Sequence, residues 1–118
     1  MRWLLGRLQG RVRRYDGVMA DLTRLTGDQI DSALANLPGW RIESGKLHRE
    51  YKFADFVHAF GFMATAAVAI EAIGHHPEWF NVYHTVKIDL TTHDAGGITS
   101  KDTDLAAKLE SIARKLQT

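Results

Sequence analysis

The chain has 118 residues, of which 45% are hydrophobic and 25% charged, and it contains no cysteine. This length suits one domain with its own hydrophobic core. The absence of cysteine excludes a disulfide framework, a thiolate nucleophile and a cysteine-based zinc site. Ten glycines and two prolines exclude a low-complexity or collagen-like chain.

Positive charge is concentrated at the start of the chain. Residues 1–20 hold five arginines and one aspartate, whereas residues 21–118 hold ten basic and thirteen acidic side chains. The mildly acidic remainder argues against a body that binds nucleic acid directly. We therefore expect a basic, flexible N-terminal extension over residues 1–20 and one domain over residues 21–118. The extension could instead touch a membrane or nucleic acid as a basic amphipathic arm.

The first elements of the domain are a short helix and a hairpin. Thr26 is followed by Gln29, a capping-box pattern that starts a helix running to about Asn36, where Pro38-Gly39 stops it. Polar and apolar residues alternate over positions 40–43 and 46–53 around Ser44-Gly45, which predicts a β-hairpin.

A long apolar helix follows, from about residue 54 to Ile73. Fourteen of the eighteen residues of Phe56–Ile73 are apolar, so both sides of this helix must be covered. One side can pack on a sheet, and we expect the other to meet a second subunit, giving a homodimer or homotetramer through this helix and a sheet edge. A membrane span is the alternative, but the segment contains His58 and Glu71 and is barely long enough, so we expect no membrane.

Gly74 and Pro77 mark the end of the long helix. Two strands are expected at about 79–84 and 85–92, then a glycine-rich loop and a last helix over 101–116. The expected order is αββαββα. It predicts an α+β fold with a single layer of four antiparallel strands and helices on one face.

The histidines suggest where chemistry could occur. His75, His76, His84 and His93 fall within nineteen residues, and the adjacent pair stands where the long helix stops. Glu71 lies four residues before His75, so across one helical turn it could orient that ring and fix its tautomer. Imidazoles titrate near neutral pH and can both donate and accept protons.

Other interpretations of these residues remain open. Trp79 and Phe80 could stack on a flat heterocyclic ligand, although such residues are more often core. We interpret His48, His58 and His84 as structural or surface residues. A zinc site is the rival interpretation of the cluster, but neighbouring helical side chains diverge by about 100° and no HxxxH or HExxH pair is present, so no metal is expected.

A longer pattern resembles a known family. It comprises Glu71-x₃-His75-His76-Pro77-Glu-Trp-Phe-Asn-Val-Tyr83, then Thr92-His93 and Asp102, with Leu-Pro-Gly-Trp40 before the hairpin. This pattern resembles the pterin-4a-carbinolamine dehydratases over about residues 22–117. The resemblance implies loss of water from a 4a-hydroxytetrahydropterin without a metal or organic cofactor, in an αββαββα protein that forms dimers or tetramers.

The resemblance also implies the roles of particular residues. The acid and base groups would be His75, His76 and His93. Contacts with the pterin substrate would come from six further residues: Glu71, Pro77, Trp79, Thr91, Thr92 and Asp94.

The same resemblance leaves two other functions open. The protein could be a non-catalytic oligomeric binding partner of the transcriptional coactivator kind, because vertebrate members of the family also serve as dimerisation cofactors of a homeodomain transcription factor. It could also be a pterin-handling accessory in molybdenum-cofactor metabolism. A cytoplasmic location is expected in each case.

Overall fold

The computed structural model describes residues 23–117. Its elements are α2 (Gly27–Leu34), β1 (Arg41–Glu43), β2 (Lys46–Lys52), α3 (Phe56–Ile73), β3 (Glu78–Val82), β4 (Thr85–Leu90), the 3₁₀ turn η1 (His93–Ala95) and α4 (Ser100–Leu116). Apart from the added turn η1, this is the expected order αββαββα. The flexible extension expected over residues 1–20 lies outside the described residues.

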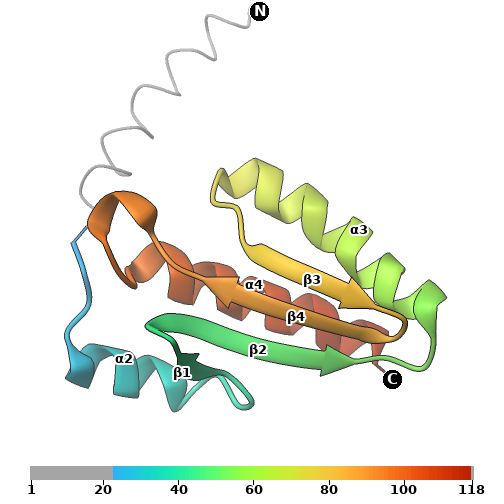
Figure 1. The fold of residues 1–118 in the computed structure, drawn as a ribbon, viewed down its shortest axis with the longest axis horizontal. Coiled ribbons are helices and arrows are strands. Elements are labelled where there is room, and N and C mark those ends of the chain that lie inside the picture. Colours follow the sequence, from blue (N-terminus) through green and yellow to red (C-terminus); the bar gives the residue numbers. More distant parts are fainter. Residues whose placement is uncertain (1–22, 118) are drawn as a thin grey trace, which may run out of the picture.

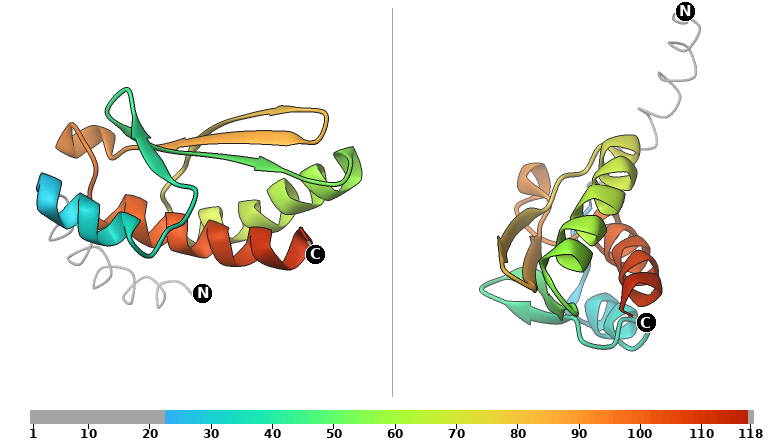
Figure 2. Two further views of the ribbon diagram at one scale, coloured as in Figure 1. Left: turned by 90° about the horizontal axis from the view of Figure 1, so that it is seen from below. Right: turned by 90° about the vertical axis from the view of Figure 1, so that its right-hand side faces the viewer.

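The four strands form one antiparallel sheet in the order β1-β2-β4-β3. The helices cover one face of this sheet, and the other face is open (Figures 1 and 2). At the centre, β2 and β4 pair Leu47 with Leu90 and Tyr51 with Val86. These four side chains are buried because alternate residues of each strand face the helices. The predicted α+β class and single-layer architecture are confirmed.

Helix α3 packs on the sheet through a narrow stripe of four buried residues, Ala59, Phe62, Ala66 and Ile70. Their spacing of three or four residues puts them on one side of the helix. At its N-terminus the Asp55 side chain accepts from the His58 amide, and hydrogen bonds from His58 lower the pKa of this carboxyl. At its C-terminus Gly74 takes a φ of 77° and its amide donates to the Ile70 carbonyl, a conformation that suits glycine.

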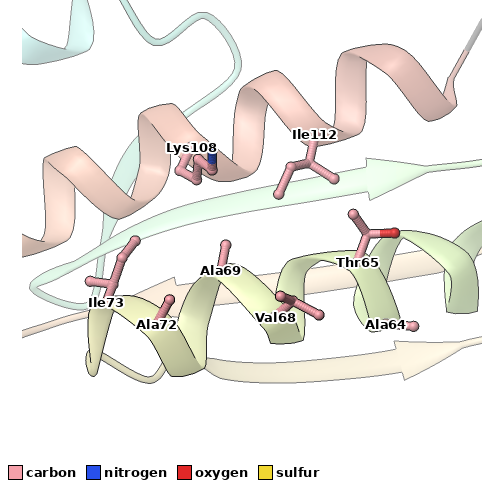
Figure 3. Close-up of a pocket in the computed structure, with 8 residues that line it drawn as sticks. All are labelled: Ala64, Thr65, Val68, Ala69, Ala72, Ile73, Lys108 and Ile112. Atoms are coloured by element: carbon pink, nitrogen blue, oxygen red, sulfur yellow. The ribbon is translucent and has the colours of Figure 1, made fainter. Parts of the chain in front are cut away.

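The opposite side of α3 is exposed and apolar. Val57 and Val68 are each 74% exposed, and Phe60 is 57% exposed. Between α3 and α4 runs an open groove of about 910 Å³, lined by Ala64, Thr65, Val68, Ala69, Ala72, Ile73, Lys108 and Ile112 (Figure 3). By length and composition α3 could cross a membrane. Its buried stripe packs against the sheet and α4.

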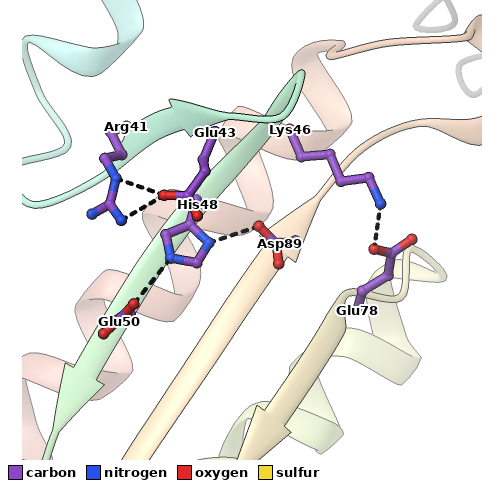
Figure 4. Close-up of polar contacts among 7 residues, drawn as sticks. All are labelled: Arg41, Glu43, Lys46, His48, Glu50, Glu78 and Asp89. Carbon is purple, nitrogen blue, oxygen red and sulfur yellow. Dashed lines mark hydrogen bonds and ion pairs between the residues drawn. The ribbon is translucent and has the colours of Figure 1, made fainter.

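The open face of the sheet is polar near β1 and charged side chains pair across its strands (Figure 4). His48 Nδ1 lies 2.7 Å from Asp89 Oδ1, and its Nε2 lies 3.5 Å from Glu50 Oε2. Lys46 Nζ reaches Glu78 Oε1 of β3 at 2.6 Å. A sheet face occupied by ion pairs needs no covering layer, which agrees with the helices lying on the other side.

The half-buried carboxylate of Glu110 links the sheet to α4. Glu110 Oε1 accepts hydrogen bonds from Trp40 Nε1 at 3.1 Å and from the Tyr51 hydroxyl. Burial, together with the Glu110 hydrogen bond, raises the pKa of Tyr51 above its ordinary value. The Arg49 guanidinium lies 4.2 Å from the centre of the Tyr51 ring. This network connects β2 to the middle of α4.

Substitution Glu110→Ala is expected to lower the free energy of unfolding by about 1–3 kcal/mol for each buried donor that loses its acceptor. The donors are the Trp40 indole and the Tyr51 hydroxyl, whose residues are 5% and 0% exposed. Urea unfolding measures the change. The control is Glu43→Ala, which removes an exposed ion pair with Arg41 and should change stability by less than about 1 kcal/mol. Equal losses in both variants would contradict this account of Glu110.

Candidate active site

Three segments meet at one end of the sheet: the α3–β3 connection, the loop that follows β4, and the start of α4 (Figure 1). The first carries His75-His76 and the second carries Thr92-His93. The left-handed Gly74 ends α3, and Pro77 disfavours helix at the residue before it. The histidine pair therefore lies in the short connection between α3 and β3, outside both elements.

The buried carboxylate of Asp102 joins these segments. Its Oδ1 lies 2.5 Å from Nε2 of His75. Its Oδ2 accepts from the Thr92 hydroxyl at 2.8 Å and from the Thr99 amide at 2.9 Å. Asp102 is 0% exposed and His75 is 8% exposed. One carboxylate thus holds both His75 and Thr92, the residue that precedes His93.

The predicted contact between Glu71 and His75 is wrong. We expected Glu71 to face His75 across one helical turn, but its Oε1 lies 3.4 Å from Nε2 of His76. The positive φ of Gly74 ends the helical spacing before His75, so the next side chains leave the helix face. The Glu71 and His76 side chains are 82% and 66% exposed, and such exposed pairs are weak.

His93 is an exposed residue at the start of η1. Strand β4 ends at Leu90 rather than at the expected Thr92, because the Thr92 amide donates to the Gly97 carbonyl instead of continuing the sheet. Thr92 is buried and Thr91 half-buried. The Thr92 hydroxyl donates to Asp102, and its backbone carbonyl accepts from the amides of Ala95 and Gly97, so Thr92 holds the loop together.

The remaining expected binding residues lie on or beside β3 and η1. Pro77 and Trp79 are half-buried, and Asp94 is exposed. Trp79 lies opposite Ile88 and packs against the core. Phe80 pairs with Lys87 and is 58% exposed. Neighbouring strand residues point to opposite faces, so the structure does not bring Phe80 together with Trp79.

The contact between Asp102 and His75 was not predicted from the sequence. The local signal was a Thr99-x-x-Asp102 capping box at the start of α4, which predicts contact with the Thr99 amide alone. The contact with His75 spans 27 residues of chain and depends on how α4 packs beside α3.

The arrangement can supply proton donors and acceptors. The imidazole of His75 is buried and held by a carboxylate. The imidazoles of His76, on the α3–β3 connection, and of His93, on the loop after β4, are exposed. Over residues 23–117, no three histidine, aspartate or glutamate side chains are grouped as ligands for one metal ion.

The chain is similar in sequence to known proteins. Residues 23–112 match the family model described as pterin 4 alpha carbinolamine dehydratase. A protein of Solibacter usitatus, named as a candidate pterin-4-alpha-carbinolamine dehydratase, is 64% identical over 91 residues, covering 77% of this chain and 96% of the relative. A similarly named protein of Rhodopseudomonas palustris is 50% identical over 95 residues, covering 79% of this chain and 94% of the relative.

Solved structures show the same fold. A transcriptional coactivator/pterin dehydratase of Brucella melitensis superposes with a TM-score of 0.74 at 45% identity, covering 77% of this chain and 99% of that one. A pterin dehydratase-like protein described as a RuBisCO assembly factor in the alpha-carboxysome superposes with a TM-score of 0.56 at 22% identity, covering 64% and 89% of the two chains. That second likeness concerns the fold alone. With a family model matched over most of its length and relatives at 50% identity or above, the chain belongs to the pterin-4a-carbinolamine dehydratase family.

Proposed function

We propose that the protein removes water from a 4a-hydroxytetrahydropterin to give the quinonoid dihydropterin. The observation that carries the proposal is the buried Asp102 carboxylate, which holds His75 and Thr92 together. It brings the segments of all three candidate acid and base residues to one place. Family membership supplies the substrate class. In a cell, this step recycles the carbinolamine that aromatic amino acid hydroxylases release, and we place it in the cytoplasm.

The reaction needs one proton donor and one proton acceptor. The C4a–O bond breaks when the hydroxyl is protonated and leaves as water. The N5–H bond gives its proton to a base, and its electron pair forms the C4a=N5 double bond. An imidazolium and a neutral imidazole can do both near neutral pH. The products therefore balance without an oxidant or reductant.

Some of the candidate residues would transfer protons and others would bind the substrate. His76 and His93 would flank the hydroxyl and N5, while His75 would hold the pterin and share in proton transfer. Glu71 would accept from an N–H group of the pterin, and the backbone groups of Thr91 would pair with the ring. Thr92, whose own backbone groups are paired within the loop, would hold that part of the site in place. Trp79 would form a wall of the site. Pro77 and Asp94 complete the proposed set.

The proposed function is tested on the purified protein with freshly generated carbinolamine, following its decay by ultraviolet absorbance. We expect decay well above the buffer rate in the wild type and in His48→Ala, a histidine on the open sheet face. No acceleration by a folded protein would contradict the proposal. It would favour a non-catalytic binding partner, or an accessory that binds pterins for molybdenum-cofactor metabolism.

We also propose a homo-oligomer built through the exposed side of α3 and the edge of the sheet. Strand β3 is one of the two edges of the described sheet, because it pairs with β4 alone. The exposed Val57, Phe60 and Val68 form an apolar surface of the kind that marks an interface.

Substitution Val68→Glu tests the contribution of α3. A buried charge without a partner is strongly unfavourable, so this variant should shift the protein toward smaller species in light scattering. Ser32→Glu places the same charge at an exposed position of α2 and should leave the mass unchanged. A monomeric wild type, or identical masses for wild type and Val68→Glu, would contradict the proposal for this surface.

A further inference from the structure

We propose that Asp102 is a positioning residue that holds His75 in the tautomer with hydrogen on Nε2. The Nδ1 nitrogen is then the one that accepts a hydrogen bond or proton from the ligand. The tautomer follows from the contacts of Asp102 alone, and its consequence for catalysis rests on the proposed function.

The direction of each hydrogen bond is set by the groups around the carboxylate. The Thr99 amide can only donate, and it donates to Oδ2 at 2.9 Å. The Thr92 hydroxyl also donates to Oδ2 and so accepts from the Thr99 hydroxyl 2.7 Å away. Thr99 Oγ1 accepts in turn from the Lys101 amide at 3.2 Å. An ionised carboxylate accepts at both oxygens, so the remaining partner of Oδ1, His75 Nε2, must be a donor.

Because these groups are buried, water cannot replace the hydrogen bonds around Asp102. Asp102 and Thr99 are 0% exposed, and Thr92 is 3% exposed. A polar network removed from water is costly to leave unpaired, so each hydrogen is held in one arrangement. The ring of His75 is thereby oriented and its tautomer chosen before any ligand binds.

This tautomer determines which histidine can accept a proton and which must donate one. With Nε2–H directed at Asp102, neutral His75 offers Nδ1 only as an acceptor. If Nδ1 takes the N5 proton, the resulting imidazolium is stabilised by the carboxylate at Nε2, as in a catalytic triad. The proton for the leaving hydroxyl must then come from one of the two exposed histidines, His76 or His93.

Substitution Asp102→Asn separates this role from simple packing. The Thr99 amide still requires an acceptor, so the asparagine oxygen should stay at the position of Oδ2. Its NH₂ group then faces Nε2 of His75 and can only donate. The imidazole must present a lone pair at Nε2 and carry its hydrogen on Nδ1. The variant should therefore invert the tautomer with little change in shape.

The experiment is long-range ¹H–¹⁵N correlation spectroscopy on the full chain labelled with ¹⁵N-histidine, with His75→Gln used to assign the His75 signals. We expect the wild type to carry hydrogen on Nε2 and Asp102→Asn to carry it on Nδ1. The matched control is Asp104→Asn, an exposed position on the same helix, which should match the wild type. A wild-type His75 with hydrogen on Nδ1 would overturn the proposal without any variant having to fold.

Kinetics test the consequence for catalysis separately. Asp102→Asn should lower kcat by about 10²-fold or more, because the same change in a catalytic triad costs about 10⁴-fold through the wrong tautomer. KM should change less than kcat, because the ring keeps its position and only the one ligand hydrogen bond accepted by Nδ1 is lost. An inverted tautomer with unchanged kcat would contradict the positioning role. If the wild type has the Nε2–H tautomer but does not accelerate carbinolamine decay, the proposed function fails and the tautomer assignment stands.

Discussion

Substitution His93→Ala should slow carbinolamine dehydration by about 10²–10⁴-fold, the usual contribution of a positioned acid or base. His93 is exposed at the start of η1, so its loss leaves no buried group unpaired and the fold should be retained. His76→Ala should have a similar effect, because the proposed function places His76 and His93 beside the hydroxyl and N5 of the pterin. Single-turnover decay of the carbinolamine measures both variants without interference from product release.

The control for these substitutions is His84→Ala. His84 lies in the turn between β3 and β4, whereas His93 follows the other end of β4, so the two histidines stand at opposite ends of that strand. The control should keep the wild-type rate. The assignment would be contradicted if His75→Ala, His76→Ala and His93→Ala all dehydrated the carbinolamine at the wild-type rate.

Substitution Phe62→Ala should lower the free energy of unfolding by about 3–5 kcal/mol. Phe62 is 0% exposed, and its ring centre lies 5.3 Å from that of Tyr51 and 5.2 Å from that of Phe53. Removing it leaves a cavity where α3 meets the sheet, which the surrounding strands cannot fill. Urea unfolding should show the loss as a lower midpoint with a similar slope.

Phe80→Ala is the matched control for Phe62→Ala. Phe80 is 58% exposed on the open face of the sheet, and exposed substitutions usually change stability by about 0.5 kcal/mol or less. If both variants lost the same stability, α3 would not be fixed to the sheet through its buried stripe.

The sequence predicts the elements well because their signals are local. The Thr26 capping box, the Ser44-Gly45 turn and the Gly74 helix end are each confirmed, since each depends on a few neighbouring residues. The alternation of apolar residues in β4 likewise predicts that Val86, Ile88 and Leu90 face the core. From such signals the α+β class and the element order follow directly.

The contacts of the site were harder to predict because they are not local. The predicted contact of Glu71 with His75 assumes that the helix continues to His75. The helix instead ends at Ile73, and the left-handed Gly74 turns the chain away before His75. The pairing of His75 with Asp102 depends on the packing of α4 beside α3. Periodicity defines the face of each helix but not the neighbour that the face meets.

The most direct test of the central claim is a crystal structure of the protein with a bound 7,8-dihydropterin. The account predicts one pterin ring at the end of the sheet where α3 and α4 meet the loop after β4. Ring nitrogens of His75, His76 and His93 should lie about 2.6–3.2 Å from it or be joined to it through one water. A pterin bound elsewhere, with these three rings directed away from it, would contradict the account.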